Sequence, residues 1–241
     1  MTLSLLKLEP DMARAARWAQ AQGLLDPRRD DDFGYAFHAL LAAAFGPLAP
    51  KPFVVQQRAG AAPSLLAYTA DDPAALRDHA AAFAEPDVVA ALGQEAMAAK
   101  AMPARFEAGR RLGFLVRTRP TVRVDRDGDR NRVRERDAFL AAIAGTPPGE
   151  GPDRATVYRD WLARRLMAGG AALESTAIDQ VQQNNVRRRG IGRRLMTLAG
   201  PDVTFSGTIR VLDPGAFADL LARGVGRHRA FGYGMVLLRP C

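Results

Sequence analysis

Apolar residues recur at every second position in some segments, which predicts strands, and at every third or fourth position in others, which predicts helices. The two kinds of segment alternate along the chain. In the first hundred residues, Asp11 is placed to cap one helix and Gly23 to end it. The expected strands are residues 2–9, 52–58 and 63–70, and the expected helices are residues 11–22, 35–45, 73–83 and 86–93. The resulting order, βααββα, is a variant of the ferredoxin-like unit.

A second series follows the joint at residues 102–111, MPARFEAGRR. The expected strands are residues 112–124, 172–181, 203–212 and 235–238, with a basic ribbon at residues 184–198, and the expected helices are residues 135–143, 155–170 and 214–224. A second ferredoxin-like unit is the simplest architecture that accommodates this order. We therefore predict an α+β protein with two tandem ferredoxin-like (RRM-like) domains, at residues 1–95 and 96–241.

Composition narrows the class of protein. The chain has 241 residues, of which 48% are hydrophobic and 25% charged, values typical of a globular protein. We expect no membrane association and a cytoplasmic location, because no long apolar run or signal peptide is visible. The single cysteine, Cys241, excludes a disulfide framework and a cysteine-based zinc site.

The charge is distributed unevenly. Residues 1–100 hold nine Lys and Arg against twelve Asp and Glu, whereas residues 101–241 hold 25 against 14. A basic C-terminal half indicates a polyanionic partner. The sequence shows no basic amphipathic helix, so a membrane surface is not the expected partner. RNA or DNA is therefore the expected partner.

One helix carries candidate chemistry. In residues 35–45 an apolar stripe should face a core, and His38 lies at the edge of that stripe, one turn after Tyr35. A histidine in this position is suited to a general-acid or general-base step near neutral pH. The alternative is a half-buried structural histidine.

The sequence indicates no metal or cofactor. His38, His79 and His228 are far apart and form no pair with metal-ligand spacing. No phosphate-binding P-loop and no G-x-S-x-G nucleophile elbow occurs. We therefore expect any reaction to proceed without a cofactor.

Two segments are candidates for binding phosphate. Residues 224–234 combine four glycines with Arg227, His228 and Arg229. This loop precedes a strand rather than following one, the reverse of the order in a dinucleotide-binding fold, so the sequence favours another phosphate partner. Residues 186–195, VRRRGIGRRL, are interpreted as a ribbon that tracks duplex phosphates, with a solvated loop as the alternative. The arginines of the ribbon are Arg187, Arg188, Arg189, Arg193 and Arg194.

These segments resemble a known family. The stretch GVGRHRAFGYGMVLL, preceded by VTFSGTIRVLDPGAFADLLARG, is similar to the glycine-rich signature of CRISPR repeat-processing endoribonucleases of the CasE family, a subunit of type I-E Cascade. The segments DFGYAFHALLAAAFGPLAPKPFVV, RLGFLVRTRPTVRV and RERDAFL resemble other parts of that family. The resemblance covers most of the chain.

The resemblance implies a function and a site. Such proteins bind the stem-loop of CRISPR repeat RNA, cleave it once without metal and keep the crRNA within Cascade, beside its other subunits. Their catalytic pair corresponds to Tyr35 and His38. The ribose 2′-OH attacks the adjacent phosphate and leaves a 2′,3′-cyclic phosphate, with His38 as acid or base.

The resemblance also assigns the phosphate-binding segments. The arginine ribbon corresponds to the hairpin that contacts the RNA stem. In the loop, the backbone at Gly224, Gly226, Gly232 and Gly234 would approach the RNA, and Arg227 and Arg229 would meet phosphates. His228 is unusual at its position and is either a second acid-base group or a spectator.

Two other functions stay open at this point. A member of the same family that caps crRNA without cleaving it would share the fold and the basic surface. A general RNA-binding protein with duplicated ferredoxin-like domains would explain the charge but not the C-terminal signature.

Overall fold

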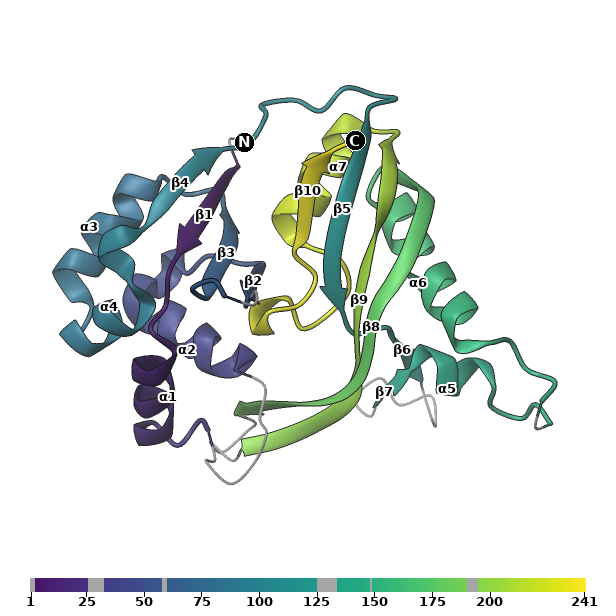
Figure 1. Ribbon diagram of the computed structural model, residues 1–241, viewed down its shortest axis with the longest axis horizontal. Helices are drawn as coiled ribbons and strands as arrows, with labels where there is room; N and C mark the ends of the chain where they lie inside the picture. Colours follow the sequence, from purple (N-terminus) through teal and green to yellow (C-terminus); the bar gives the residue numbers. More distant parts are fainter. Residues whose placement is uncertain (1–2, 26–32, 58–59, 125–133, 148, 190–194) are drawn as a thin grey trace.

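The chain forms two α+β units that lie side by side, each built on a four-stranded antiparallel sheet (Figure 1). The computed structural model describes residues 3–25, 33–57, 60–124, 134–147, 149–189 and 195–241. Among these residues, no helix is both long and apolar enough to cross a membrane.

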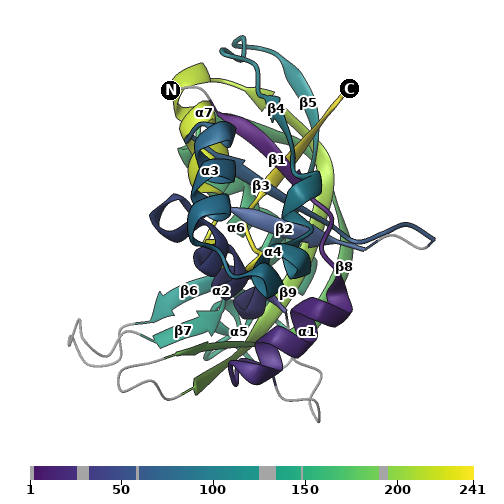
Figure 2. The same ribbon diagram turned by 90° about the vertical axis from the view of Figure 1, so that its left-hand side faces the viewer.

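The first unit has the sheet order β2-β3-β1-β4. Its strands are β1 (Ser4–Leu8), β2 (Phe53–Gln56), β3 (Ser64–Thr69) and β4 (Ala98–Ala101). Its helices are α1 (Met12–Ala21), α2 (Gly34–Phe45), α3 (Pro73–Phe83) and α4 (Pro86–Leu92), with the 3₁₀ turns η1 (Gly46–Leu48) and η2 (Gln94–Ala96). Helices α3 and α4 cover the outer face of this sheet (Figure 1 and Figure 2).

The second unit repeats the arrangement, with the order β10-β5-β9-β8. Its sheet consists of β5 (Arg111–Thr118), β8 (Ala171–Arg189), β9 (Leu195–Val211) and β10 (Val236–Pro240). The other elements are the paired strands β6 (Thr121–Val124) and β7 (Arg134–Asp137), the helices α5 (Ala138–Ala142), α6 (Arg154–Ala168) and α7 (Pro214–Arg223), and the turn η5 (Arg229–Phe231). In both sheets the first strand lies between the third and the fourth, which confirms the prediction of two ferredoxin-like units.

Three predicted elements differ from the structure, and the first is the expected strand 112–124, which the structure divides into β5 and β6. Residues 135–143 were expected to be one helix, but residues 134–137 pair with β6 and only residues 138–142 are helical. Asp137 separates the two, because its side chain accepts a hydrogen bond from the Phe139 amide at 2.8 Å and so begins α5. Strand β8 runs well past the expected residue 181, since the polar residues 182–185 stay paired with β9.

Strand β4 was not predicted. All four of its residues, AAKA, are exposed, so its sequence carries no alternation of apolar and polar positions. Only its pairing with β1 places it in the first sheet. The division of the chain into domains after residue 95 stays a prediction, and β4 lies just beyond that residue.

Helix α2 packs as its apolar spacing predicts. The residues of the stripe are all buried: Phe37, Leu40, Leu41, Ala44 and Phe45. They belong to the core of the first unit, together with Leu6 and Leu8 of β1. This packing fixes the rotation of α2 about its axis and leaves Tyr35 and His38 half-buried at the edge of the helix.

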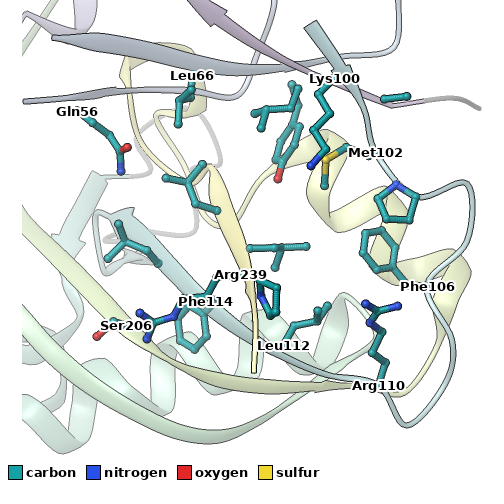
Figure 3. A pocket seen from close by; sticks show the side chains of 18 residues that line it. Gln56, Leu66, Lys100, Met102, Phe106, Arg110, Leu112, Phe114, Ser206 and Arg239 are labelled. Atoms are coloured by element: carbon teal, nitrogen blue, oxygen red, sulfur yellow. The ribbon is translucent and has the colours of Figure 1, made fainter. Parts of the chain in front are cut away.

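The two sheets face each other across a cavity of about 750 Å³ (Figure 3). Leu5, Leu66 and Phe114 contribute apolar walls, and Lys100, Arg110 and Arg239 bring positive charge to the lining. On one side of it the units are joined by Tyr68 of β3, whose hydroxyl donates to the carbonyl oxygen of Val236 at 2.9 Å. None of the predicted site residues is among the 18 that line this cavity.

A buried carboxylate holds the second unit together. Asp202 of β9 is 2% exposed and pairs with Arg117 of β5 at 2.5 Å. Gln182 and Asn184 of β8 donate to the same carboxylate at 3.0 and 3.1 Å, and the Tyr233 hydroxyl lies 3.4 Å away. Burial acts to raise the pKa of Asp202, but Arg117, Gln182 and Asn184 lower it more, so this pKa lies below its ordinary value.

Replacement of Asp202 by Asn should destabilise the protein. The substitution leaves the charge of Arg117 without its carboxylate, and we expect the free energy of unfolding to fall by about 3 kcal/mol. The measurement is urea unfolding near neutral pH. Asp179→Asn is the matched control, because that exposed carboxylate on β8 lies outside the cluster and accepts from the Ser206 hydroxyl at 2.9 Å.

The loss of stability caused by Asp202→Asn should become smaller as the pH falls. Because the carboxyl of folded Asp202 titrates below the ordinary value of 3.8, its contribution is complete above that pH and is lost as the pH falls through the folded pKa. The difference in stability between the wild type and Asp202→Asn should therefore shrink in acid. A difference that is constant with pH, or equal to that of the control, would contradict this assignment.

Candidate active site

The first turns of α2 present two aromatic side chains that point the same way. Helix α2 begins at Gly34, and its geometry places residues 35 and 38 on one face. The ring centroids of Tyr35 and His38 are 6.0 Å apart, with the planes tilted by 34°. The spacing along the helix therefore brings these two predicted residues together.

The glycine-rich loop of the second unit packs against this end of α2. Turn η5 in the loop carries Phe231, whose ring lies 5.6 Å from that of Tyr35 and 5.4 Å from that of His38, edge-on to both. Phe231 is a residue of the site that sequence reasoning missed. The glycines around it marked a turn, but nothing in the spacing indicated that this aromatic ring would reach a helix of the other unit.

A basic residue near His38 was also missed. Burial of the imidazole lowers the pKa of His38, and the positive charge of Lys51 lowers it further. Lys51 follows η1 and precedes β2, in a segment that resembles the family but in which the sequence assigns no role to this residue. Its side chain nevertheless carries charge next to the candidate catalytic pair.

Phe231 also lines a pocket of about 570 Å³, whereas Tyr35 and His38 are not among its lining residues. The charged and aromatic residues that line it are Lys51, Glu135, Arg223, Arg227, His228, Arg229 and Phe231. Four of these side chains are cations and one is a carboxylate. Such a pocket is suited to an anion. It is connected to His38 through Phe231, whose ring contacts that of His38.

The polar side chains of the loop make contacts within the protein. Arg227 pairs with Glu135 at 3.0 Å, and His228 Nε2 donates to the other oxygen of the same carboxylate at 2.7 Å. Arg229 donates to the carbonyl oxygen of Arg223 at 2.7 Å. The hydrogen bond from His228 lowers the pKa of Glu135, so this carboxylate is ionised at neutral pH. Contacts of Arg227 and Arg229 with phosphate stay a prediction.

The loop glycines have reasons inside the protein for being glycines. Gly224, Gly226, Gly232 and Gly234 all adopt positive φ. At Gly226, with φ of 77°, a Cβ would also lie 2.8 Å from Cη2 of the buried Trp161. A close approach of RNA to this backbone stays a prediction.

The arginine ribbon lies on the long hairpin formed by β8 and β9. Arg187, Arg188 and Arg189 form the end of β8 and pair with residues 195–197 of β9, whereas Arg193 and Arg194 lie outside the described residues. The hairpin extends beyond the second sheet, and part of β8 lies beside α2 (Figure 1). The fold thus gathers the helix with Tyr35 and His38, the glycine-rich loop and the hairpin on one side of the molecule.

No metal-binding cluster is found in the part of the chain that the structure describes. Groups of three or more His, Cys, Asp and Glu side chains able to hold an ion do not occur there. His79, on α3, is separate from the site, with Nδ1 3.3 Å from the carbonyl oxygen of Ala44.

Comparison with solved structures identifies the fold. Cse3 of Thermus thermophilus, bound to an RNA representing a pre-cleavage complex, is 22% identical, with a TM-score of 0.66 over 100% of both chains. Cas6e of Escherichia coli K-12 is 18% identical, with a TM-score of 0.57 over 100% of both chains. A chain of a CRISPR RNA-guided surveillance complex in a pre-nicking state is 18% identical, with a TM-score of 0.58 over 99% of this chain and 100% of that one.

Sequence comparison identifies the family. A search of curated proteins finds no match. The family model described as CRISPR associated protein matches residues 1–240, which is nearly the whole chain. Together with the double ferredoxin-like fold shared with Cse3, this match shows that the chain belongs to the CRISPR-associated protein family.

Proposed function

We propose that this protein is a metal-independent endoribonuclease that binds the stem-loop of CRISPR repeat RNA and cleaves pre-crRNA. The observation that carries the proposal is that Phe231 contacts the rings of both Tyr35 and His38 and also lines a basic pocket that the other unit largely supplies. The similar structure of Cse3 is bound to RNA in a pre-cleavage state, and Cas6e shares the same fold. Retention of crRNA as a subunit of Cascade is part of the proposal.

The proposed reaction needs one proton acceptor at the attacking oxygen. The ribose 2′-oxygen loses its proton and attacks the adjacent phosphorus, and the bond to the 5′-oxygen breaks. The leaving oxygen takes a proton from water, so the products end in a 2′,3′-cyclic phosphate and a 5′-hydroxyl. A neutral imidazole accepts the 2′-OH proton, and the lowered pKa of His38 keeps it neutral at pH values near 7. His38 is therefore the proposed base.

The neighbours of His38 have supporting roles in this scheme. Lys51 lowers the pKa of His38 and brings positive charge to a reaction centre where negative charge increases on the phosphate oxygens. Tyr35 is placed to orient the imidazole or the phosphate. Holding the 2′-OH in line with the leaving oxygen contributes much of the acceleration, so few groups are needed.

Binding of the RNA stem is assigned to the hairpin of β8 and β9. Its arginines would neutralise phosphates of an A-form stem and recognise shape more than sequence. A protein that caps crRNA without cutting would use the same surface, and the cleavage experiment below distinguishes the two functions.

His38→Ala should slow single-turnover cleavage of the repeat RNA by about 10²- to 10⁴-fold, the effect of losing a general acid or base. Affinity for the uncut stem-loop should change little, because the arginines supply it. Chelator should leave the wild-type rate unchanged, and a 2′-deoxy substrate should bind without being cut.

The matched control for His38→Ala is His79→Ala, which removes a histidine outside the site. Near wild-type cleavage by His38→Ala, or a requirement for Mg²⁺, would refute the mechanism. A wild-type protein that binds the stem-loop tightly and never cuts it would identify the capping function instead.

Lys51→Met should shift the pH dependence of cleavage. The rate should rise with pH as His38 loses its proton, with a midpoint below the ordinary 6.5. Removing the nearby positive charge raises the pKa of His38, so this limb of the pH–rate profile should move to higher pH. Lys100→Met, at a lysine on β4, is the control. Identical profiles for Lys51→Met and the wild type would exclude Lys51 from the site.

Replacing Arg188, Arg189 and Arg193 together by Ala should weaken stem-loop binding. Fewer counterions are released on binding, so the slope of log affinity against log salt should fall by about one for each phosphate that the protein no longer neutralises. The control removes three other arginines, Arg105, Arg159 and Arg164, of which the latter two lie on α6. Equal changes in affinity and slope for both triple variants would contradict the hairpin assignment.

A further inference from the structure

Glu135 is the one carboxylate among the described residues that line the basic pocket, and it belongs to neither the helix nor the loop of the site. It lies on β7, in the small hairpin with β6. Two consecutive loop residues bind its two oxygens separately, Arg227 at 3.0 Å and His228 at 2.7 Å. The Glu135 side chain is only 27% exposed, and that of His228 is 6% exposed. The contact with His228 is therefore largely shielded from water, whereas the Arg227 side chain is 39% exposed.

The backbone at His228 needs such contacts. Its φ of 60° and ψ of 26° are left-handed, and among the described non-glycine residues no other has positive φ. A Cβ disfavours this conformation, although histidine tolerates it better than most residues. The bond from Nε2 to Glu135 holds the side chain in place and with it the turn of the backbone.

The turn at His228 determines where Phe231 lies. The amide of Phe231 donates to the carbonyl oxygen of His228 at 2.8 Å, closing the turn that begins at the left-handed residue. The Phe231 ring then packs 6.1 Å from the ring of His228 and 5.4 Å from that of His38. A contiguous path of contacts thus leads from Glu135 through His228 and Phe231 to His38.

The rest of the loop is held near its ends. The backbone amide of Val225 donates to the carbonyl oxygen of Gly234 at 2.8 Å, and the amide of Gly234 donates to the carbonyl oxygen of Arg117 on β5 at 2.7 Å. Arg229 is bound to the last residue of α7, Arg223. These bonds fix the ends of the loop and one side of its turn, whereas the bonds to Glu135 fix residues 227 and 228, where the backbone reverses.

We propose that Glu135 is a positioning residue of the active site: through His228 and Arg227 it holds the glycine-rich loop so that Phe231 is seated against the rings of Tyr35 and His38. His228 is then neither a second acid-base group nor a spectator, because its Nε2 is bound to the carboxylate. The inference rests on the proposed cleavage of repeat RNA at this site.

The decisive variants are Glu135→Ala and Glu135→Gln. Glu135→Ala should slow single-turnover cleavage by about 10- to 100-fold, since a small displacement of positioned groups has an effect of this size, while the affinity for uncut RNA stays within about threefold. Glu135→Gln keeps the shape and one acceptor oxygen, so its rate should lie between those of Glu135→Ala and the wild type.

A double-mutant cycle tests the path through His228. His228→Gly removes the imidazole, and glycine adopts the same backbone conformation without strain. Because this change and Glu135→Ala remove the same contact, the double variant should be no slower than the slower single variant. Rate losses that multiply in the double variant would show independent roles and overturn the path.

Glu174→Ala is the matched control. Glu174 has a side chain that is 25% exposed and accepts from two cations, Arg111 at 2.7 Å and Arg210 at 3.1 Å, but it lies on β8 outside the pocket. Its replacement should leave the cleavage rate unchanged. Equal rates for Glu135→Ala and Glu174→Ala would overturn the proposal.

Hydrogen exchange of the amides at residues 226–233, without RNA, gives a second readout. Exchange there should be faster in Glu135→Ala and Glu135→Gln than in the wild type, and unchanged in Glu174→Ala. Unchanged loop exchange in both Glu135 variants would overturn the positioning role. If the wild type fails to cut repeat RNA, the proposed function fails, and this measurement still decides whether Glu135 holds the loop.

Discussion

The buried ion pair between Asp202 and Arg117 is the interaction on which the second unit depends. A carboxylate and a guanidinium removed from water must satisfy each other, so their partners have little freedom to move. Asp202 is on β9, Arg117 on β5, and Gln182 and Asn184 donate from β8. The three strands are therefore locked together where the long hairpin leaves the sheet. The guanidinium also lies 4.5 Å from the ring centroid of Tyr233, which connects this cluster to the glycine-rich loop.

From that anchor the loop reaches a helix of the other unit, and the candidate active site is therefore composite. The first unit supplies Tyr35 and His38 on α2, held in rotation by the buried stripe of that helix. The second unit supplies Phe231 and most of the cations of the pocket. Neither ferredoxin-like unit contains the whole site. The hydrogen bond from the Tyr68 hydroxyl to the carbonyl oxygen of Val236 is one of the contacts that hold the two units together.

Charge is arranged around this site so that the histidine stays neutral in a positive environment. Burial and Lys51 both lower the pKa of His38, which suits a base next to a bound anion. A surplus of cations would repel one another without a counter-charge, and Glu135 provides one for Arg227 and accepts a hydrogen bond from His228. The same carboxylate thus offsets repulsion within the loop and fixes its conformation. Electrostatics and loop geometry are coupled at one residue.

The sequence by itself determined the local structure: the apolar periods predicted most helices and strands, and the stripe on residues 35–45 placed Tyr35 and His38 at the edge of a helix. It also determined the uneven charge and the glycine-rich turn, because these are properties of neighbouring residues. Only the tertiary structure decided that Phe231 meets His38, that Lys51 lies near it and that Glu135 binds His228, 93 positions away. The tertiary structure also decided that residues 98–101 form strand β4, because their sequence carries no apolar alternation and only their pairing with β1 makes them a strand. Contacts between residues far apart in the chain depend on how the sheets and helices pack, and no period or spacing within a segment records that packing.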